Sequence, residues 1–412
     1  MTGTGSTRPI VVMKFGGTSV ADSAGRDALA RRVAAALELD KAPVLVVSAM
    51  GRSGAPYATD TLLGLVADLP VDAREHDLLA SVGELVSAVV VAHELRAAGI
   101  EASAFSGAEA GIATDGIAGV ASITSIDVSR LRSSIASGIV PVVAGFQGLS
   151  ADGSLTTLGR GGSDTTACAL GVALGAEEVE IYTDVDGVMS ADPRVCDGSG
   201  VLEVIGADEL FQMARTGSRV VHTPAAELAL NSGIPVRVRN TFSQHEGTLV
   251  ADVADIAAYR PDRVATAVSH SSGVVQFRVT LPSPEGTSEH MRSQTRVYRA
   301  MADAGVSLDM FTPVGDRMVF TVPEQASADA CGVLLQLGLE HETLPGLSKV
   351  TLVGAGMHGV PGVMARLAEY LAAAGVDIHQ SADSHTTISV LIPSEDTAIA
   401  IRALHDGFEL GE

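Results

Sequence analysis

Apolar positions follow two different patterns along the chain, which change near residue 250. In the first part, short apolar runs alternate with stretches in which apolar residues recur every three or four positions. The short runs are 10–13, 44–48, 139–144 and 179–182, and the helical stretches are 28–37 and 78–97. Short apolar runs separated by helices are typical of a mostly parallel sheet covered on both faces. This part therefore predicts an α/β domain.

The second part of the chain repeats itself. It begins after residues 251–265, which hold proline and several charges and lack a strand pattern. Residues 302–308 recur as 372–378, and each copy ends a helix on a glycine, Gly305 or Gly375. Strand patterns precede and follow each copy. Two β-α-β-β units predict a paired module, because solenoids usually need at least three repeats.

Composition narrows the class of protein. The 412 residues exceed what one hydrophobic core usually supports, so two or more domains are expected. A net charge of −22 disfavours nucleic acid and anionic membranes as partners, so an anion site must be built locally from backbone N–H groups and a few cations. The three cysteines lack zinc-site spacing, which favours a reduced cytoplasmic protein. Residues 1–9 lack a signal-peptide pattern, and no apolar stretch approaches the length that spans a membrane.

The first candidate motif, Lys14 to Ser19, lies between a predicted strand and a predicted helix. Gly16 and Gly17 would let the backbone approach an anion closely, with N–H groups at the helix start pointing at it. Lys14 could reach a transferring phosphoryl group as a point charge. The alternative is a tight strand–helix turn with a surface lysine. The position of Lys14 directly after a buried strand favours the anion site.

The second motif, residues 159–167, holds three glycines around Arg160 and then a helix start. Arg160 offers a planar fork for a carboxylate, and Ser163 is a candidate N-cap for a helix that runs to about Leu174. Asp164 would lie in the first turn. It could simply favour the helix dipole, but this would not explain an arginine held between glycines.

The third motif covers residues 182–188 and 191–194, where a strand ends in a polar loop. Asp184 and Asp186 could hold Mg²⁺ through water or contact a ribose, or could only form Asx turns. All three motifs follow predicted strands, so a parallel sheet would place them on one edge. Phosphoryl transfer to a carboxylate needs two substrates in line and neutralised charge on the γ-phosphoryl group. The three motifs together supply groups for both tasks.

Together the motifs resemble those of the aspartate kinases in the amino-acid kinase superfamily, over nearly the whole chain. The segments that carry the resemblance are KFGGTSV (14–20), VVSAMG (46–51), GE (83–84), VVAGFQG (142–148), TLGRGGSDTTA (157–167), YTDVDGV (182–188), ADPR (191–194) and IPVRVRNTFS (234–243). The C-terminal part is similar to tandem ACT domains, with LVGAGM at 352–357 and ISVLI at 388–392. Residues 50–65 and 380–392 are most similar to the diaminopimelate-sensitive aspartokinases of bacilli.

This resemblance implies a fold and a reaction. The fold is a three-layer αβα sandwich with a mostly parallel sheet at 1–252. Two ferredoxin-like (βαββαβ) ACT domains follow at 262–340 and 345–412, and the last segment is a candidate to return to the first. The reaction is ATP-dependent phosphorylation of L-aspartate to 4-phospho-L-aspartate, with ATP and Mg²⁺. It opens the route to lysine, diaminopimelate, threonine and methionine, so feedback regulation through the ACT domains is expected, in a cytoplasmic homodimer or higher homo-oligomer.

The resemblance also implies roles for matching residues. Lys14 and Asp164 would form the catalytic pair. The residues expected to hold ATP are Lys14, Phe15, Gly16, Gly17, Thr183, Asp184, Asp192, Pro193, Arg194 and Arg219. Those expected to bind aspartate are Thr59, Glu84, Arg160, Gly161 and Ser163, with Arg160 on the α-carboxylate and Glu84 on the ammonium group. From its local pattern alone, Glu84 would be interpreted as a solvated helix residue.

Two departures from the family pattern affect these expectations. Residues 217–219 read Gly-Ser-Arg where many members have a GAK-type turn, so Arg219 keeps the charge with a different geometry. Residues 309–313 are shorter than the Asn-containing loop usual in the first ACT copy. An effector site is expected on loops at the ACT interface, unless these loops only pack a dimer. Its candidate residues are Asp309, Met357, Val360, Pro361, Gln380 and Asp383.

Two other functions compete with this interpretation. One is another acyl-phosphate kinase of the superfamily that acts on an N-acylated amino acid, against which Arg160 and Glu84 favour a free α-amino acid. The other is a non-catalytic relative whose ACT pair senses an amino acid. Lys14 and Asp164 argue against the sensor.

Overall fold

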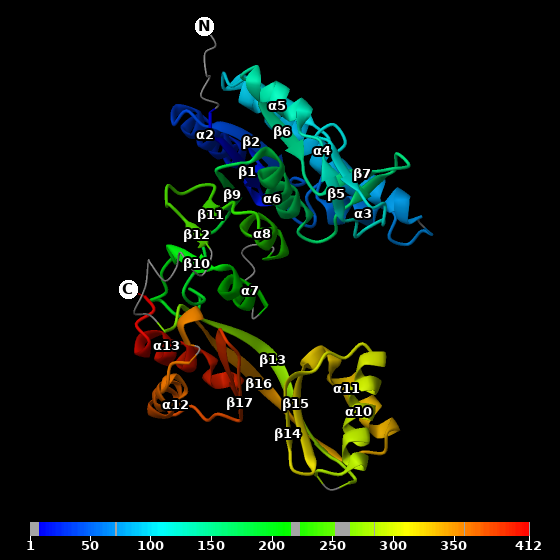
Figure 1. The fold of residues 1–412 in the computed structure, drawn as a ribbon, viewed down its shortest axis with the longest axis vertical. Coiled ribbons are helices and arrows are strands. Elements are labelled where there is room, and N and C mark those ends of the chain that lie inside the picture. Colours follow the sequence, from blue (N-terminus) through cyan, green and yellow to red (C-terminus); the bar gives the residue numbers. More distant parts are fainter. Residues whose placement is uncertain are drawn as a thin grey trace. The chain divides into compact units, whose positions relative to one another are not determined.

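The computed structural model describes residues 8–411, apart from 71, 216–222, 252–263, 284 and 358. The chain divides into two compact units (Figure 1). Unit 1 comprises residues 1–188, 201–214 and 219–261, and unit 2 comprises 189–200, 215–218 and 262–412. Residues 189–200, which contain the second part of the third motif, therefore belong with the C-terminal part.

Unit 1 is built on an eight-stranded sheet in the order β10-β12-β11-β9-β1-β2-β6-β3. Its strands are β1 (Ile10–Phe15), β2 (Ala42–Val47), β3 (Ala102–Phe105), β6 (Val140–Ala144), β9 (Glu178–Thr183), β10 (Val204–Gly206), β11 (Val236–Asn240) and β12 (Thr248–Ala251). All neighbouring pairs are parallel except β11 with β12. The four strands and the mostly parallel sheet predicted from the apolar runs are confirmed.

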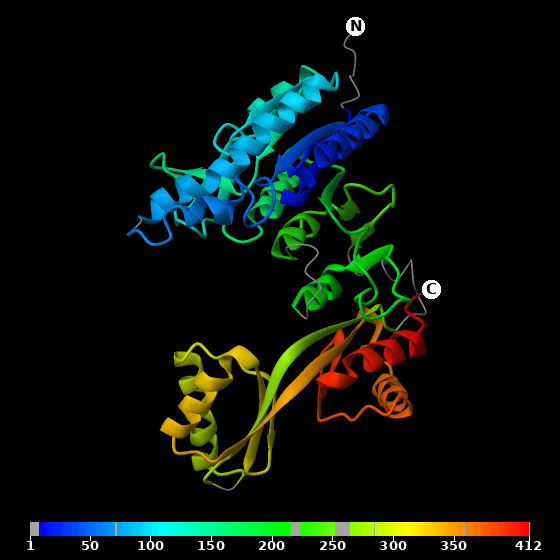
Figure 2. The ribbon, with the colours of Figure 1, turned by 180° about the vertical axis from the view of Figure 1, so that it is seen from behind.

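Helices cover both faces of this sheet (Figures 1 and 2). They are α1 (Gly17–Val20), α2 (Ser23–Glu38), α3 (Thr59–Gly64), α4 (Ala73–Ala97), α5 (Ser129–Ala136), α6 (Gly162–Leu174), α7 (Ala207–Arg215) and α8 (Thr223–Leu230). Val33 of α2 and Leu95 of α4 share one buried core with Met13 and Leu45 of the sheet. On the other face, α6 packs against β1 and α8. The three-layer αβα arrangement expected from the resemblance is therefore present.

A second, four-stranded sheet in unit 1 was not predicted. Its order is β5-β4-β7-β8, and its strands are β4 (Ile112–Thr114), β5 (Ile123–Ile126), β7 (Gln147–Ser150) and β8 (Leu155–Thr157). These strands are short and partly polar, so the chain shows no apolar run that would reveal them. This sheet matters because β8 leads directly into the glycine-rich loop around Arg160.

Unit 2 contains one six-stranded sheet in the order β14-β15-β13-β16-β18-β17. Its elements are β13 (Ala267–Thr280), α10 (Ser288–Asp303), β14 (Asp309–Val314), β15 (Arg317–Pro323), α11 (Ser327–Gln336), β16 (His341–Val353), α12 (Val363–Ala373), β17 (Gln380–Asp383), β18 (Thr387–Pro393) and α13 (Thr397–Gly407), with 3-10 turns at 324–326, 355–357 and 394–396. Gly305 and Gly375, with φ of +71° and +74°, follow the ends of α10 and α12 as predicted.

The two long strands β13 and β16 run through both repeated modules (Figures 1 and 2). The second part of β13, Val274–Thr280, pairs with β15 of the first module. The first part of β13, from Ala267, pairs with the end of β16, and that end of β16 also pairs with β18 of the second module. No cut between residues 340 and 345 therefore separates the modules. The sequence suggested that the last segment returns to the first module. Instead the chain ends in α13, whose Ile401 and Leu404 pack into the second module's core.

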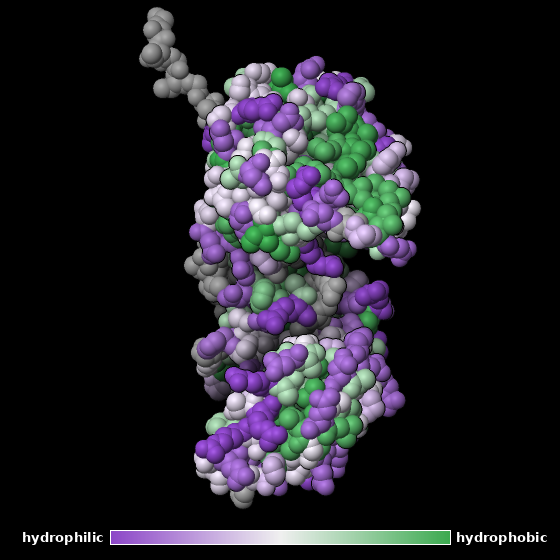
Figure 3. All heavy atoms as spheres, turned by 90° about the vertical axis from the view of Figure 1, so that its right-hand side faces the viewer, coloured by the Kyte–Doolittle hydropathy of each residue, from purple (hydrophilic) through white to green (hydrophobic). Residues whose placement is uncertain are grey.

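The expectation that no apolar stretch approaches membrane-spanning length is wrong for helix α4. Its length and composition would allow it to cross a membrane. Half of its most apolar window is buried in unit 1, and Ala88, Val91 and Leu95 belong to the core. Its exposed side adds Val82 and Val89 to the surface, and Figure 3 shows apolar surface gathered on that unit. An amphipathic core helix accounts for the apolar stretch.

Candidate active site

The first glycine motif lies where two neighbouring parallel strands end. β1 and β9 pair Phe15 with Tyr182, and the Gly16 N–H donates to the Tyr182 carbonyl at 3.2 Å. A Cβ added to Gly17 would lie 2.5 Å from the Gly51 carbonyl oxygen, so only glycine fits there. The turns after β1, β2 and β9 are thus packed backbone against backbone.

Lys14 and Asp164 form an ion pair that joins the first and second motifs. The Lys14 Nζ lies 2.7 Å from Asp164 Oδ1, and the side chains are only 13% and 12% exposed. Lys14 is near the end of β1, whereas Asp164 is in the first turn of α6. The second motif follows β8 of the small sheet, so the expectation that all three motifs follow strands of one sheet is wrong, although the loops still meet.

Arg160 is held by its backbone and presents its side chain to solvent. Gly159 and Gly161 have φ of +72° and +73°, a region that favours glycine, so the chain reverses on both sides of the arginine. The Arg160 guanidinium has no hydrogen bond or ion pair within the part of the chain that the structure describes. Ser163 does not cap α6 as predicted, because Gly161 is the N-cap residue and Ser163 is already inside the helix and buried.

Glu84 is the most unusual carboxylate of the candidate site. It lies on α4 and is only 3% exposed. Its Oε1 accepts the Ala49 N–H at 3.1 Å, while Oε2 has no hydrogen-bond partner among the described residues. Burial raises its pKa to about 7, against which the hydrogen bond from Ala49 acts only partly. A buried oxygen without a donor is suited to a ligand that brings one, such as an ammonium group.

Gly83 brings the loop before α3 against Glu84. A Cβ on Gly83 would lie 2.6 Å from the Tyr57 carbonyl oxygen and 2.7 Å from the Ala49 Cβ. Thr59 opens α3 two residues after Tyr57 and is partly buried. The structure thus brings the Thr59 loop close to Glu84, as the expected aspartate site requires.

The third motif combines an exposed and a structural carboxylate. Asp184 Oδ2 accepts a hydrogen bond from Arg52 at 2.7 Å, and the Thr183 hydroxyl donates to its Oδ1 at 3.2 Å. Asp186 instead accepts from Asn240 at 2.9 Å, and hydrogen bonds from Ser243 and Asn240 hold its pKa low. Asp186 therefore ties the loop after β9 to the end of β11, which favours the structural interpretation for this residue.

Phe15, expected among the ATP residues, has a fully buried side chain that stacks on Tyr182 with ring centroids 4.6 Å apart. Only its backbone atoms could therefore contact a nucleotide.

Three expected ATP residues, Asp192, Pro193 and Arg194, lie in unit 2. Arg194 Nη2 is 2.7 Å from Asp192 Oδ2, and the arginine side chain is 87% exposed. Hydrogen bonding from Arg194 holds the Asp192 pKa below its usual range. The segment is attached to α13, where Ser190 Oγ and His405 Nε2 are 2.9 Å apart. Arg219 lies outside the described residues.

The expected effector residues separate into two groups. Met357, Val360 and Asp383 line a cavity of about 400 Å³ between α12 and β17. Asp309 forms an ion pair with Lys349, and the Gln380 side chain is bonded to Gln276 at 2.9 Å. Asp309 and Gln380 lie on β14 and β17, not on loops as expected. Pro361 is outside the residues that line the cavity.

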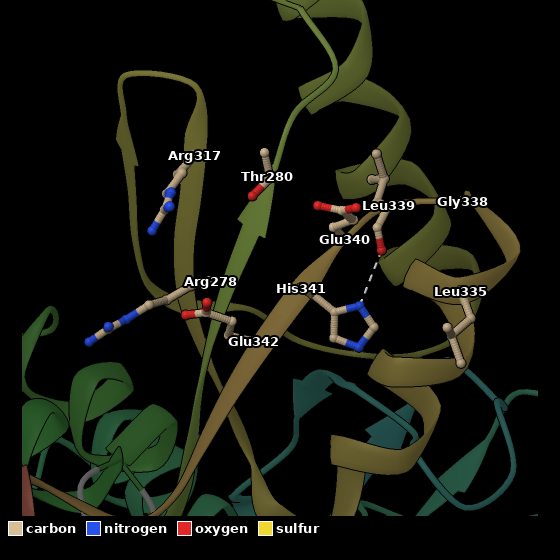
Figure 4. A pocket seen from close by; sticks show the side chains of 9 residues that line it. All are labelled: Arg278, Thr280, Arg317, Leu335, Gly338, Leu339, Glu340, His341 and Glu342. Carbon is tan, nitrogen blue, oxygen red and sulfur yellow. Dashed lines mark hydrogen bonds between the residues drawn. The ribbon is translucent and has the colours of Figure 1, made fainter.

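A second groove, of about 540 Å³, lies at the other end of unit 2 and contains no expected residue (Figure 4). Arg278 and Arg317 line it together with Glu340 and Glu342, and His341 is hydrogen-bonded to the Leu339 carbonyl at 3.2 Å. Its two acids balance its two arginines, so its charge favours neither anions nor cations.

Two side chains of the site were missed by sequence reasoning. Arg52 contacts the third motif from the loop after β2, and Asp77 of α4 contacts Thr157, just before the second motif. Neither has a local signal, because a lone arginine in a polar loop and a lone aspartate in a helix are normally solvated. Only the three-dimensional contacts reveal them.

Comparison with known proteins gives consistent matches over the whole chain. Residues 9–240 match the amino acid kinase family, and residues 342–406 match an ACT domain. Aspartokinase 1 of Bacillus subtilis is 42% identical over 98% of this chain and 100% of the relative, and an aspartokinase of Thermus thermophilus is 38% identical over 97% and 99%. An aspartokinase of Mycobacterium tuberculosis is 38% identical over 98% and 96%.

Two solved structures share the fold. The aspartate kinase of Clostridium acetobutylicum superimposes with a TM-score of 0.81 at 20% identity, over 97% of this chain and 100% of that one. E. coli aspartokinase III in complex with aspartate and ADP superimposes with a TM-score of 0.70 at 24% identity, over 97% and 99%. At these identities the two structures bear on the architecture alone.

Proposed function

The chain belongs to the aspartokinases of the amino acid kinase family, and from this premise we propose that it phosphorylates L-aspartate. The γ-phosphoryl group of ATP passes to the side-chain carboxylate, giving 4-phospho-L-aspartate and ADP, the first step towards lysine, threonine and methionine. The observation that carries the proposal is the buried Glu84 carboxylate, whose Oε2 has no donor among the described residues. A free α-ammonium group supplies that donor, and an N-acylated substrate does not.

Lys14 is the group that would neutralise charge on the transferring phosphoryl. A side-chain oxygen of aspartate attacks the γ-phosphorus, the bond between this phosphorus and the β,γ-bridging oxygen breaks, and ADP keeps the electron pair. Asp164, 2.7 Å from the Lys14 Nζ, orients that cation. The Gly16 N–H is already bonded to the Tyr182 carbonyl, so the Gly17 N–H at the start of α1 would face the β- and γ-phosphates. Catalysis of this kind consists mainly of positioning and electrostatics.

The amino acid would lie between Glu84 and the second motif. Glu84 receives the ammonium group and the Arg160 guanidinium pairs with the α-carboxylate, so the two ends of the substrate backbone are recognised by opposite charges. Thr59, Gly161 and Ser163 would complete this subsite. The support is that Arg160 has a fixed backbone and a guanidinium without a partner in the described part of the chain.

The nucleotide would use the third motif. Asp184 is exposed and Thr183 half-buried at the end of β9. Asp192, Pro193, Arg194 and Arg219 are further proposed contacts on the basis of the resemblance. Mg²⁺ would arrive with ATP, since the described residues contain no cluster of three acidic, histidine or cysteine groups that could hold a metal alone. This ion usually binds substrate phosphates and one or two carboxylates, and Asp184 fits that role.

Regulation and assembly extend the proposal to unit 2. An amino acid that is an end product of the route would bind in the 400 Å³ cavity lined by Met357, Val360 and Asp383. Asp309, Pro361 and Gln380 would act through the neighbouring strands and turn. We further propose a cytoplasmic homodimer, or a higher homo-oligomer, formed through the ACT domains.

A coupled ADP-release assay tests the central proposal. With saturating MgATP, aspartate should give turnover, whereas N-acetyl-L-glutamate should remain at background. Turnover of the N-acyl compound without aspartate turnover would assign the chain to a different substrate. Background rates with every acid, together with melting temperatures that respond to amino acids, would point instead to a sensor.

A further inference from the structure

Asp77 is a buried carboxylate outside the residues assigned above. It lies near the start of α4 and is only 1% exposed. The Thr157 hydroxyl donates to Oδ1 at 2.7 Å, the Thr157 N–H donates to Oδ2 at 2.9 Å, and the Gly119 N–H lies 3.0 Å from both oxygens. Within the described part of the chain it forms no ion pair. Burying a carboxylate against neutral donors alone is costly, so its contacts need an explanation.

The donors to Asp77 lie immediately before the loop that carries Arg160. Thr157 is the last residue of β8, three positions before Arg160. Gly119 lies against the same loop, because a Cβ on Gly159 would be 3.1 Å from the Gly119 carbonyl oxygen. The Ala121 N–H also donates to the Thr157 carbonyl at 2.9 Å. Asp77 therefore joins two chain segments at the point from which Arg160 projects.

The same helix also carries Glu84, seven residues further on. Two helical turns separate Asp77 and Glu84, roughly 10 Å along one face of α4. Between them, the Ser81 carbonyl accepts the Gln147 Nε2 hydrogen at 3.1 Å, which attaches β7 to the same face. A single rigid helix thus supports both the carboxylate proposed for the ammonium group and the loop of the arginine proposed for the α-carboxylate.

We propose that Asp77 is a positioning residue for the amino acid, which sets where the Arg160 guanidinium lies relative to Glu84. This inference rests on the proposed function, because it assumes that both groups bind one α-amino acid. Asp77 acts through the backbone at Thr157 and Gly119 and does not itself touch the substrate. Its contribution falls on aspartate binding and leaves nucleotide binding unchanged.

The test is Asp77→Asn in the full-length chain. The amide NH₂ would face an N–H donor of Thr157 or Gly119, which displaces the loop while leaving the size of the side chain unchanged. The KM for aspartate should rise about tenfold or more, which corresponds to about 1.4 kcal/mol, while the KM for ATP stays within about twofold. Asp72→Asn is the matched control, since Asp72 caps the same helix through the Arg74 N–H at 2.9 Å and is exposed. It should leave both KM values unchanged.

A double-mutant cycle with Arg160→Ala separates positioning from general stability. If Asp77 acts through Arg160, Asp77→Asn adds no further loss of aspartate kcat/KM in the Arg160→Ala background. Additive losses, or equal increases in both KM values, would overturn the proposal. Should Asp77→Asn fail to fold, Thr157→Val removes one donor and should give a smaller rise in the aspartate KM, whereas Thr157→Ser should behave as wild type. A Thr157→Val variant with an unchanged aspartate KM would also overturn it.

The outcome for the wild-type chain keeps the two proposals distinct. If the wild-type chain does not turn over aspartate, the proposed function fails whatever the variants do. If it does turn over aspartate, and aspartate raises the melting temperature of Asp77→Asn as much as that of the wild type, only the positioning role fails.

Discussion

Replacing Glu84 by glutamine should stabilise the protein at alkaline pH and weaken aspartate binding. Glutamine has the same size, and its carbonyl oxygen can still accept the Ala49 N–H. It removes the buried charge and presents an NH₂ group, which would repel an ammonium ion. Stability and function are therefore expected to change in opposite directions.

The size of the stability effect follows from the Glu84 pKa. Burial raises this pKa from 4.5 to about 7 in the folded chain, and one pKa unit corresponds to about 1.4 kcal/mol. Between pH 4.5 and 7 the unfolded chain releases a proton that the folded chain retains, so the wild type loses stability as the pH rises through this window. The loss reaches roughly 3 kcal/mol above pH 7. Glutamine does not titrate, so the variant avoids it.

Melting curves and initial rates measure both effects. The variant and the wild type should melt alike at pH 4.5, and the variant should melt several degrees higher at pH 8. For the wild type at saturating MgATP, aspartate kcat/KM should fall about tenfold per pH unit below pH 7, because only ionised Glu84 binds the ammonium group. The variant should show a low value with a flatter profile, and Glu75→Gln, on an exposed position of α4, should match the wild type.

Either of two results would refute this account of Glu84. The first is a Glu84→Gln variant that melts below the wild type at pH 8, since burial would then not penalise the charge. The second is a pH profile of aspartate kcat/KM that has the same shape for the wild type and for Glu84→Gln. Ionisation of ATP or of the free amino acid is common to both proteins, so it cannot produce a difference between them.

Further predictions concern the other loops and the cavity. Lys14→Met should lower kcat about 10²-fold to 10³-fold. Adding Asp164→Asn to the Lys14→Met variant should lower kcat little further, as expected for two groups that act together, and additive losses in initial-rate assays would contradict this. Gly17→Ala should raise the KM for ATP at least about tenfold, because its Cβ would lie 2.5 Å from a carbonyl oxygen, while Gly64→Ala, with nothing within 4 Å, should have no effect on that KM. At least one of lysine, threonine, methionine and diaminopimelate should lower the rate. Val360→Phe should abolish this response by placing a bulkier side chain in the lining of the 400 Å³ cavity, without changing the basal kcat; an inhibited Val360→Phe enzyme would place the effector elsewhere.

Local patterns were sufficient for the elements that are regular and apolar. The runs at 10–13, 44–48, 139–144 and 179–182 are fully or largely buried strands, so their composition reports their position directly. The glycines that end α10 and α12 adopt the left-handed conformation that the repeat implied. The first two loops do meet at the Lys14–Asp164 pair, but the reason given for this from the sequence was wrong, because the second loop follows β8 of the small sheet.

The remaining features depend on contacts between distant parts of the chain. Glu84 and Asp77 lie in a helix whose pattern gives no reason to expect two buried carboxylates, and only the resemblance singled out Glu84. The small sheet has short, partly polar strands. Ser163 lost the capping role because Gly161, two residues earlier, takes the left-handed conformation at the N-cap. The burial of the two carboxylates and the formation of the small sheet are determined by partners far along the sequence, whereas the cap of α6 is a local effect.

The continuous strands β13 and β16 have a consequence for folding cooperativity. Val275, Phe277 and Val279 of β13 pack into one core of unit 2, while Val268 of the same strand packs into the other. A one-residue slip of this strand would turn apolar side chains out of both cores at once. Because β13 contributes to both cores, unfolding of one core would expose apolar side chains of the other. The C-terminal region should therefore unfold in a single cooperative transition.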